Sequence, residues 1–143
     1  VWLETLRLRS PAPFLLLSAA EPLELAGRSV PRGTRIVTLT RYMTRHAPEA
    51  CNLLGSDLSE FRPERWLRED GGLVEFAPLD TISFGHGVRK CPGQGLAEAE
   101  GWLVLAEILR RFHVERGMDT LGEATAFTQT AAEDVVLRLS RRV

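Results

Sequence analysis

The sequence predicts a mixed α and β fold that is mainly α, with short β-strands, an irregular segment, a cysteine loop and one long helix after that loop. Three observations predict it. The strongest helical pattern covers residues 94–112, directly after a loop that contains Cys91. Short apolar runs bounded by proline and glycine precede it and are typical of strands. Residues 48–83 carry glycines and prolines without a strong period, which indicates an irregular segment.

The first nine residues have apolar side chains at helical spacing, and they predict the end of an amphipathic helix that Pro11 and Pro13 terminate. The elements that follow are short. In order, they are a buried strand at 14–17, a strand at 23–25 running into the turn Ala26-Gly27, a turn at 31–34, a strand at 35–39, and one or two helical turns at 40–47.

The helix predicted at Gln94–Phe112 has two adjacent apolar rows and one narrow polar strip. A surface that is apolar over so wide an arc predicts a helix that is mostly buried. After it, residues 113–115 and 135–139 predict two closing strands joined by a polar connection.

Composition narrows the class of protein. The chain has 143 residues, of which 44% are hydrophobic and 26% charged, and its formal net charge is −1. These values predict a soluble globular domain, exclude a disordered tail and give no broad basic surface for nucleic acid. The apolar run at 14–17 is too short to cross a bilayer. The chain starts at Val1 and reads at once as helix interior without a targeting segment, so we expect a fragment or an incomplete gene model.

The two cysteines, Cys51 and Cys91, are too few for a disulfide framework and form no C-x-x-C zinc pair, which favours a reduced intracellular setting. Cys51 falls in the irregular segment and is interpreted as incidental. The histidines His46, His86 and His113 are scattered and predict no metal cluster. His86 lies inside the cysteine loop, but an isolated histidine without a partner is usually structural.

The cysteine loop has the spacing F-x-x-G-x-R-x-C-x-G, made by Phe84, Gly87, Arg89, Cys91 and Gly93. A lone cysteine in a turn is most often a small buried hydrophobe. Five specified positions in ten residues, just before a strong helix, argue against that interpretation.

Each residue has a physical task if a haem lies against this loop. The glycines, including Gly85, let the backbone bend and approach a flat macrocycle closely. Arg89 can pair with a propionate, and Phe84 can shield the ring and the sulfur from water. The start of the long helix favours a thiolate at Cys91. Such a thiolate donates electron density to an iron and favours O–O cleavage, which is oxygen-activation chemistry.

The loop resembles the haem-binding signature of the cytochrome P450 family, and other segments resemble family motifs in the same order. These are Glu4-Thr5-Leu6-Arg7 for E-x-x-R, Val30-Pro31-Arg32-Gly33-Thr34 for the I-P-x-G-T turn, Phe61–Trp66 for the P-E-R-[FW] element, and Ala97 with Glu100 for A-x-x-E. The resemblance implies that residues 1–143 are the C-terminal part of the P450 fold, from the E-x-x-R helix onward, with an N-terminal portion missing. It also implies that Cys91 is the iron ligand and that Ala97 joins the loop residues in contacting the cofactor.

Glu4 and Arg7 share one helix face, and an isolated pair of this kind is worth only roughly 0–1 kcal/mol. The resemblance adds Arg65 and implies a buried network that locks the core around the cysteine loop. Loss of one partner of such a network costs about 3–5 kcal/mol. We therefore interpret these three residues as structural.

The resemblance places substrate contacts at Pro13, Phe14 and Leu15 and at Phe127 and Thr128, with an ordinary strand and a hairpin tip as the open alternative. The chain departs from many relatives at Leu17-Ser18, where a propionate-binding arginine is absent, so Arg89 would carry more of that pairing, with His86. Gln94-Gly95 replaces the Arg-Arg of mitochondrial-type members. Whether the chain resembles the mitochondrial-type or the bacterial members of the family stays open, and so does the identity of its redox partner.

The resemblance implies a haem-thiolate monooxygenase that uses haem b and O2, acts on a lipophilic small molecule and receives electrons from a reductase or a ferredoxin. Membrane association would come through the missing N-terminal portion. The location would be a mitochondrial or endoplasmic-reticulum membrane in a eukaryote and the cytoplasm in a bacterium. The alternative is a truncated, inactive product, because the distal oxygen-activating helix of the family is not among these residues. A zinc or redox-thiol module fails for want of a second ligand at suitable spacing.

Overall fold

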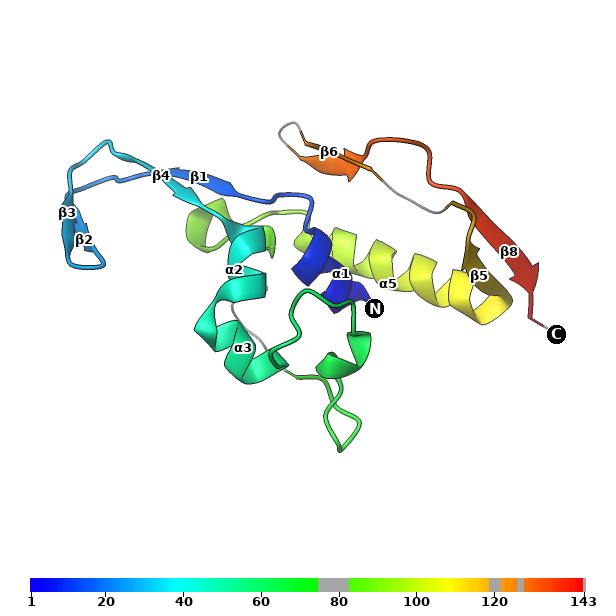
Figure 1. Ribbon diagram of the computed structural model, residues 1–143. Coiled ribbons are helices and arrows are strands. Elements are labelled where there is room, and N and C mark those ends of the chain that lie inside the picture. The colour runs from blue at the N-terminus through cyan, green and yellow to red at the C-terminus, as the bar shows by residue number, and fades with distance from the viewer. Residues whose placement is uncertain (75–82, 119–121, 126–127, 143) are drawn as a thin grey trace.

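The computed structural model describes residues 1–74, 83–118, 122–125 and 128–142, and it confirms a mixture of helices and short strands (Figure 1). The helices are α1 (Trp2–Arg9), α2 (Thr40–His46), α3 (Pro48–Leu54) and α5 (Gln94–Arg111), with 3-10 turns η1 (Pro63–Trp66) and η2 (Gly87–Arg89). The strands are β1 (Leu15–Ser18), β2 (Leu23–Leu25), β3 (Arg28–Val30), β4 (Arg35–Thr38), β5 (Phe112–Arg116), β6 (Glu123–Thr125), β7 (Gln129–Ala131) and β8 (Leu137–Arg141). The described strands pair antiparallel in four two-stranded sheets: β1 with β4, β2 with β3, β5 with β8, and β6 with β7.

The core lies where α1, α3 and η1 meet. Its buried apolar residues are Ala50, Leu54, Leu58 and Trp66, with Leu3 packed against them. Ala50 and Leu54 are four residues apart and so lie on one face of α3, which begins with a proline at its first turn. The prediction of an irregular segment over 48–83 is therefore wrong for residues 48–54, because a single amphipathic stretch of two turns is too short to show a clear period.

The strand predicted at residues 14–17 is confirmed as β1, but the prediction that it is buried is wrong. Leu16 pairs with Val37 and Leu17 with Ile36, yet Leu16 is 63% exposed. Within the described residues β1 pairs only with β4, and such a two-stranded ribbon leaves much of each strand uncovered. An apolar run thus predicted the strand correctly and its environment wrongly.

The turn predicted at Ala26-Gly27 is confirmed as a β-hairpin between β2 and β3. Both residues have positive φ, 50° and 73°, as a two-residue hairpin turn of the primed type requires. Strand β3 was not predicted, since its sequence is polar and only three residues long.

Helix α5 confirms the long helix after the cysteine loop, but the expectation that it is mostly buried is wrong. None of its residues is buried, and Leu103 is 67% exposed. Figure 1 shows α1 beside one part of α5 and β5 continuing from its end. At the α1 contact, a Cβ added to Gly101 would lie 2.7 Å from Cε3 of Trp2, so glycine lets the two helices approach. The apolar periodicity predicts an apolar face on α5 that would be buried by other residues, and the described part of this chain buries little of that face.

The predicted closing strands are confirmed as the pair β5 and β8, although β8 begins two residues later than expected, at Leu137. The connection between them, predicted only as polar, contains the hairpin β6–β7, whose register pairs Glu123 with Ala131. Among the described residues, no helix combines the length and the apolar character that a membrane span needs.

Candidate functional site

Helix α1 carries a completely buried ion pair between Glu4 and Arg7. Both side chains have 0% exposed surface. Arg7 donates two parallel hydrogen bonds to the carboxylate, from Nε to Oε2 (2.9 Å) and from Nη2 to Oε1 (2.7 Å). This fork geometry is the strongest form of a guanidinium–carboxylate contact.

Arg65 of η1 joins the pair from a segment 61 residues away in sequence. Its Nε donates to Glu4 Oε1 (3.0 Å), and its Nη1 donates to Asp57 Oδ1 (3.1 Å). The three residues that the sequence assigns to one network, Glu4, Arg7 and Arg65, are therefore brought together. Asp57 was not anticipated, and its pKa is lowered chiefly by the hydrogen bond from Arg65.

Two further donors to Glu4 were also missed by the sequence interpretation. The indole Nε1 of Trp66 donates to Oε2 (2.8 Å), and the backbone N of Arg62 donates to Oε1 (3.0 Å). The sequence did offer a signal for Trp66. It is next to Arg65 in the P-E-R-W segment, and a buried tryptophan N–H usually needs a hydrogen-bond acceptor. With these bonds, the Glu4 carboxylate accepts five hydrogen bonds.

The remaining donors of Arg7 bind backbone carbonyls of the segment before η1 and of α2, where Nη1 donates to the carbonyl oxygen of Thr44 (3.3 Å). Nη1 donates to the carbonyl oxygen of Leu58 (2.6 Å) and Nη2 to that of Glu60 (3.1 Å). In return, Thr44 Oγ1 of α2 donates to the carbonyl oxygen of Arg7 (2.7 Å). The network thus links α1, α2 and the segment before η1 by hydrogen bonds rather than by apolar packing alone.

The electrostatic consequence appears in the pKa of Glu4. Burial by itself raises this pKa, but the hydrogen bonds from Arg7, the Arg62 backbone and Trp66 outweigh it and lower the pKa from 4.5 to about 2. The carboxylate is therefore ionised in the folded protein at neutral pH. It faces the two buried guanidinium groups of Arg7 and Arg65, and Asp57 supplies the second carboxylate that pairs with Arg65.

The cysteine loop is held by backbone geometry. The backbone N of Cys91 donates to the carbonyl oxygen of Phe84 (2.7 Å), which closes the loop across η2. Gly85 and Gly87 have φ of 78° and 62°, values that residues with a side chain rarely adopt. Lys90 N donates to the carbonyl oxygen of Gly87 (3.1 Å) and tightens the turn. The glycines are thus required by the course of the backbone.

Cys91 lies three residues before the start of α5, and its side chain is exposed. A Cβ added to Gly93, which directly precedes the helix, would lie 3.8 Å from Cys91 Sγ, so the sulfur lies beside the first turn. Ala97 N donates to the carbonyl oxygen of Gly93 (2.9 Å), whereas the first turn has no acidic residue and no side-chain cap. The positive end of the helix is therefore open to an anionic sulfur.

The loop residues other than Cys91 include apolar and charged side chains. Phe84 and Gly85 are half-buried, and Arg89 and His86 are exposed. Val88 of η2 and Leu96 of α5 are exposed apolar side chains near the same turn. The loop thus presents a thiol, a cation and apolar groups to its surroundings.

The two candidate substrate segments are flanked by residues that contact each other, because the backbone N of Gln129 donates to the Pro11 carbonyl oxygen (2.8 Å). Pro13, Phe14 and Leu15 are half-buried, and the backbone N of Arg41 donates to the Pro13 carbonyl oxygen (3.2 Å). Thr128 is exposed between β6 and β7, and Phe127 lies outside the described residues. The sequence alternative of a hairpin tip at Thr128 agrees with its place between these strands.

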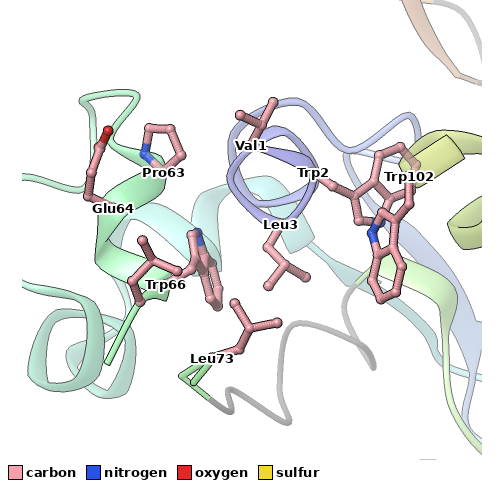
Figure 2. Close-up of a pocket in the computed structure, with 9 residues that line it drawn as sticks. Val1, Trp2, Leu3, Pro63, Glu64, Trp66, Leu73 and Trp102 are labelled. Atoms are coloured by element: carbon pink, nitrogen blue, oxygen red, sulfur yellow. The ribbon is translucent and has the colours of Figure 1, made fainter. Parts of the chain in front are cut away.

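A cavity of about 370 Å³ lies between α1, η1 and α5. Figure 2 shows Leu3, Trp66 and Leu73 pointing toward one another, with the rings of Trp2 and Trp102 on the side of α5. No residue of the cysteine loop lines it. We assign it no ligand.

Comparisons with known proteins give the family. The family model for cytochrome P450 matches residues 1–132. The chain is 39% identical over 109 residues to cytochrome P450 734A5 of Oryza sativa subsp. japonica, covering 76% of this chain and 20% of that protein. It is 37% identical over 118 residues to farnesoate epoxidase of Bombyx mori (80% and 22%), and 34% identical over 141 residues to cytochrome P450 monooxygenase ACRTS1 of Alternaria alternata (97% and 36%).

A solved structure agrees with this family assignment. The crystal structure of the cytochrome P450DA heme domain superposes with a TM-score of 0.77 at 27% sequence identity, covering 98% of this chain and 30% of that chain. The chain therefore belongs to the cytochrome P450 family and has its fold. It spans between about a fifth and about a third of the length of these relatives.

The residues of the cysteine loop fit the haem that this family binds. The exposed Cys91 is a soft ligand suited to iron, Arg89 can pair with a carboxylate, and Val88 and Leu96 can cover an apolar ring. In the described residues, no group of three or more histidine, cysteine or acidic side chains could hold a metal ion.

Proposed function

We propose that this chain is the haem-binding C-terminal part of a cytochrome P450 monooxygenase in which Cys91 Sγ is the proximal ligand to the iron of haem b. The observation that carries the proposal is the exposed thiol beside the open first turn of α5, in a loop closed by the hydrogen bond from Cys91 N to Phe84 O. The free amides of that first turn can donate hydrogen bonds to the sulfur.

The residues around the sulfur have separate tasks. Phe84, Gly85, Gly87, Gly93 and Ala97 shape the surface against which the haem lies. Arg89, exposed on η2, pairs with a propionate. When bound, the haem supplies oxygen activation, by which one atom of O2 enters a lipophilic organic substrate and electrons come from a reductase or a ferredoxin.

The buried network of Glu4, Arg7 and Arg65 is structural in this proposal. It holds α1 against the segment around η1, and α1 also contacts α5 through Trp2 and Gly101. The network thereby supports the helix whose first turn positions Cys91. Its loss should prevent haem incorporation instead of changing the reaction.

The short span of the chain relative to its relatives bears on activity. Because these residues correspond to 20–36% of the lengths of the relatives named above, we propose that activity belongs to a longer protein and that these residues alone are inactive. From the family membership, we propose a location in a mitochondrial or endoplasmic-reticulum membrane, or in a bacterial cytoplasm.

The competing proposal is a truncated, inactive product, favoured by the uncovered apolar surface of α5. Upstream coding sequence continuous with Val1 supports the enzyme, and an in-frame stop codon there supports the truncated product.

The ligand assignment is tested by the absorption spectrum of the reduced, carbon-monoxide-bound holoprotein and of its Cys91→Ser variant. We expect a thiolate-type Soret band in the wild type and its complete loss in Cys91→Ser, because a serine oxygen does not replace the soft, electron-donating sulfur. The matched control is Cys51→Ser, which alters the chain's other cysteine, a half-buried residue at the core. A folded, haem-loaded wild type without that band, or a Cys91→Ser variant that keeps it, would refute the proposal.

A further inference from the structure

A second cluster of charged residues joins α1 and α2 to the hairpin β6–β7, which the Glu4 network does not reach. Arg41 of α2 donates from Nη1 to Glu123 Oε2 (2.9 Å) and from Nη2 to Glu123 Oε1 (3.1 Å). Arg9, at the end of α1, contacts the same carboxylate through Nη1. Glu123 lies on β6, 82 residues after Arg41, so one carboxylate connects the hairpin β6–β7 to the two helices.

Arg41 also binds both segments that flank this junction. Its backbone N donates to the carbonyl oxygen of Pro13, and its Nη1 donates to Oε1 of Gln129 on β7. The backbone N of Gln129 in turn donates to the carbonyl oxygen of Pro11 (2.8 Å). The hairpin is therefore attached to the 11–13 turn by one backbone hydrogen bond and by the side chain of Arg41, which is only 14% exposed.

The cluster has more cations than anions. Arg45 of α2 lies close enough to lower the pKa of Arg41, after the larger effect of burial, and Arg9 adds to this effect. Arg45 donates to the carbonyl oxygen of Leu8 (2.8 Å) and so stays at the junction. Glu123 is the carboxylate that offsets the repulsion between Arg9 and Arg41, because it contacts both.

We infer that Glu123, held between Arg9 and Arg41, is a positioning residue that fixes the hairpin β6–β7 against the Pro11–Pro13 turn. The inference rests on the proposed function, because the two segments that it aligns are those assigned to the substrate, at Pro13–Leu15 and at Thr128. The carboxylate sets the distance between them and so selects substrates by their length and shape. It contacts neither the cysteine loop nor, in this proposal, the haem.

The first experiment measures whether Glu123 holds the hairpin. In the complete holoprotein, Glu123→Gln keeps the shape of the side chain and removes its charge. We expect the amide of Gln129 to exchange with solvent deuterium roughly threefold to fivefold faster, since its bond to Pro11 loses the support of the ion pair. The amides that pair β5 with β8 should be unchanged.

The matched control is Glu107→Gln, which removes a carboxylate that binds Arg110 and Arg111 within α5. The ion pairs that this substitution breaks are exposed and join no distant segments. The exchange of Gln129 should therefore be unaltered. Raising NaCl from about 0.05 M to about 0.5 M should accelerate this exchange in the wild type but not in Glu123→Gln, because salt screens a partly exposed ion pair such as Arg9–Glu123. Equal exchange in wild type and Glu123→Gln overturns the inference.

The second experiment measures selectivity with defined iron ligands: imidazole and N-alkylimidazoles carrying butyl or dodecyl chains. We expect Glu123→Gln to bind imidazole as the wild type does and to change its preference between the butyl and dodecyl compounds by about threefold to fivefold. An unchanged preference overturns the inference even if exchange at Gln129 is faster. A wild type that lacks the thiolate-type band refutes the proposed function instead, while the exchange experiment still tests the attachment of the hairpin.

Discussion

Two glutamate–arginine pairs with the same three-residue spacing lie on different helices of this chain. Glu4 and Arg7 of α1 are joined at 2.7 Å with both side chains 0% exposed, whereas Glu107 and Arg110 of α5 are joined at 3.0 Å with side chains 50% and 67% exposed. The shortest distances are similar, but the environment differs, and Arg7 binds through two nitrogens whereas Arg110 binds through Nη2 alone. The first pair has been removed from water and needs all its partners, while the second exchanges its bonds with solvent at little cost.

The comparison extends to the regions that carry these pairs. Around α1, side chains and carbonyl groups from four segments meet at Glu4 and Arg7. Around the start of α5, order comes from glycines with positive φ and one short backbone hydrogen bond, and Cys91 is exposed. The region around α1 is thus held by buried charges, and the cysteine loop is held by backbone geometry on an open surface.

The largest expected effect tests this contrast directly. Arg7→Met should destabilise the holoprotein by about 3–5 kcal/mol, because it leaves the Glu4 carboxylate buried with fewer donors. Arg110→Met is the matched control and should leave the urea midpoint unchanged within error. The measurement is urea unfolding together with haem content. An Arg7→Met variant with wild-type stability and full haem content would remove the distinction between the two pairs.

A second prediction uses the pH dependence of stability. Since folding lowers the pKa of Glu4 from 4.5 to about 2, its ionisation stabilises the folded state fully above pH 4.5, and this contribution is lost as the pH falls through 2. The contribution at neutral pH is on the order of 3 kcal/mol. Glu4→Gln has no such carboxylate, so the gap in urea midpoint between wild type and variant should narrow as the pH decreases from neutral toward about 3.

The control for this prediction is Glu107→Gln, whose pH profile should follow that of the wild type because the carboxylate is exposed. A gap between wild type and Glu4→Gln that stays constant with pH would show that Glu4 acts through packing instead of through its charge.

The smallest expected effect concerns the cysteine loop. Gly85→Ala places a side chain at φ 78°, where the nearest atom, the Arg89 carbonyl oxygen, is 3.5 Å from the added Cβ. The space is therefore sufficient, and the cost of about 1–2 kcal/mol comes from the backbone conformation. We expect a lower urea midpoint and faster haem loss. Gly95→Ala, in the first turn of α5 with open space around it, should be neutral or stabilising by up to about 1 kcal/mol. Equal behaviour of the two variants would contradict a loop held by its glycines.

Much of the local structure could be predicted from the sequence because it depends on near neighbours. The prolines after Arg9 end α1, the Ala26-Gly27 pair makes a hairpin turn, and the rows of apolar residues make α5 a helix. The E-x-x-R and P-E-R-W motifs brought Glu4, Arg7 and Arg65 into one hypothesis, and the structure places them in contact. The burial of β1 and α5 could not be predicted in this way, because an apolar pattern does not state which residues cover it.

By itself, the sequence determined the family, the cysteine loop with Cys91 before a helix, and the type of most elements, since these follow from spacing and turn chemistry along a few residues. Only the tertiary structure decided which of two identically spaced ion pairs is buried, that Trp66 and the Arg62 backbone complete the shell of Glu4, and that Glu123 meets Arg9 and Arg41. The physical reason is that desolvation and charge pairing depend on segments about 60 to 80 residues apart in the chain, whose approach no local pattern encodes.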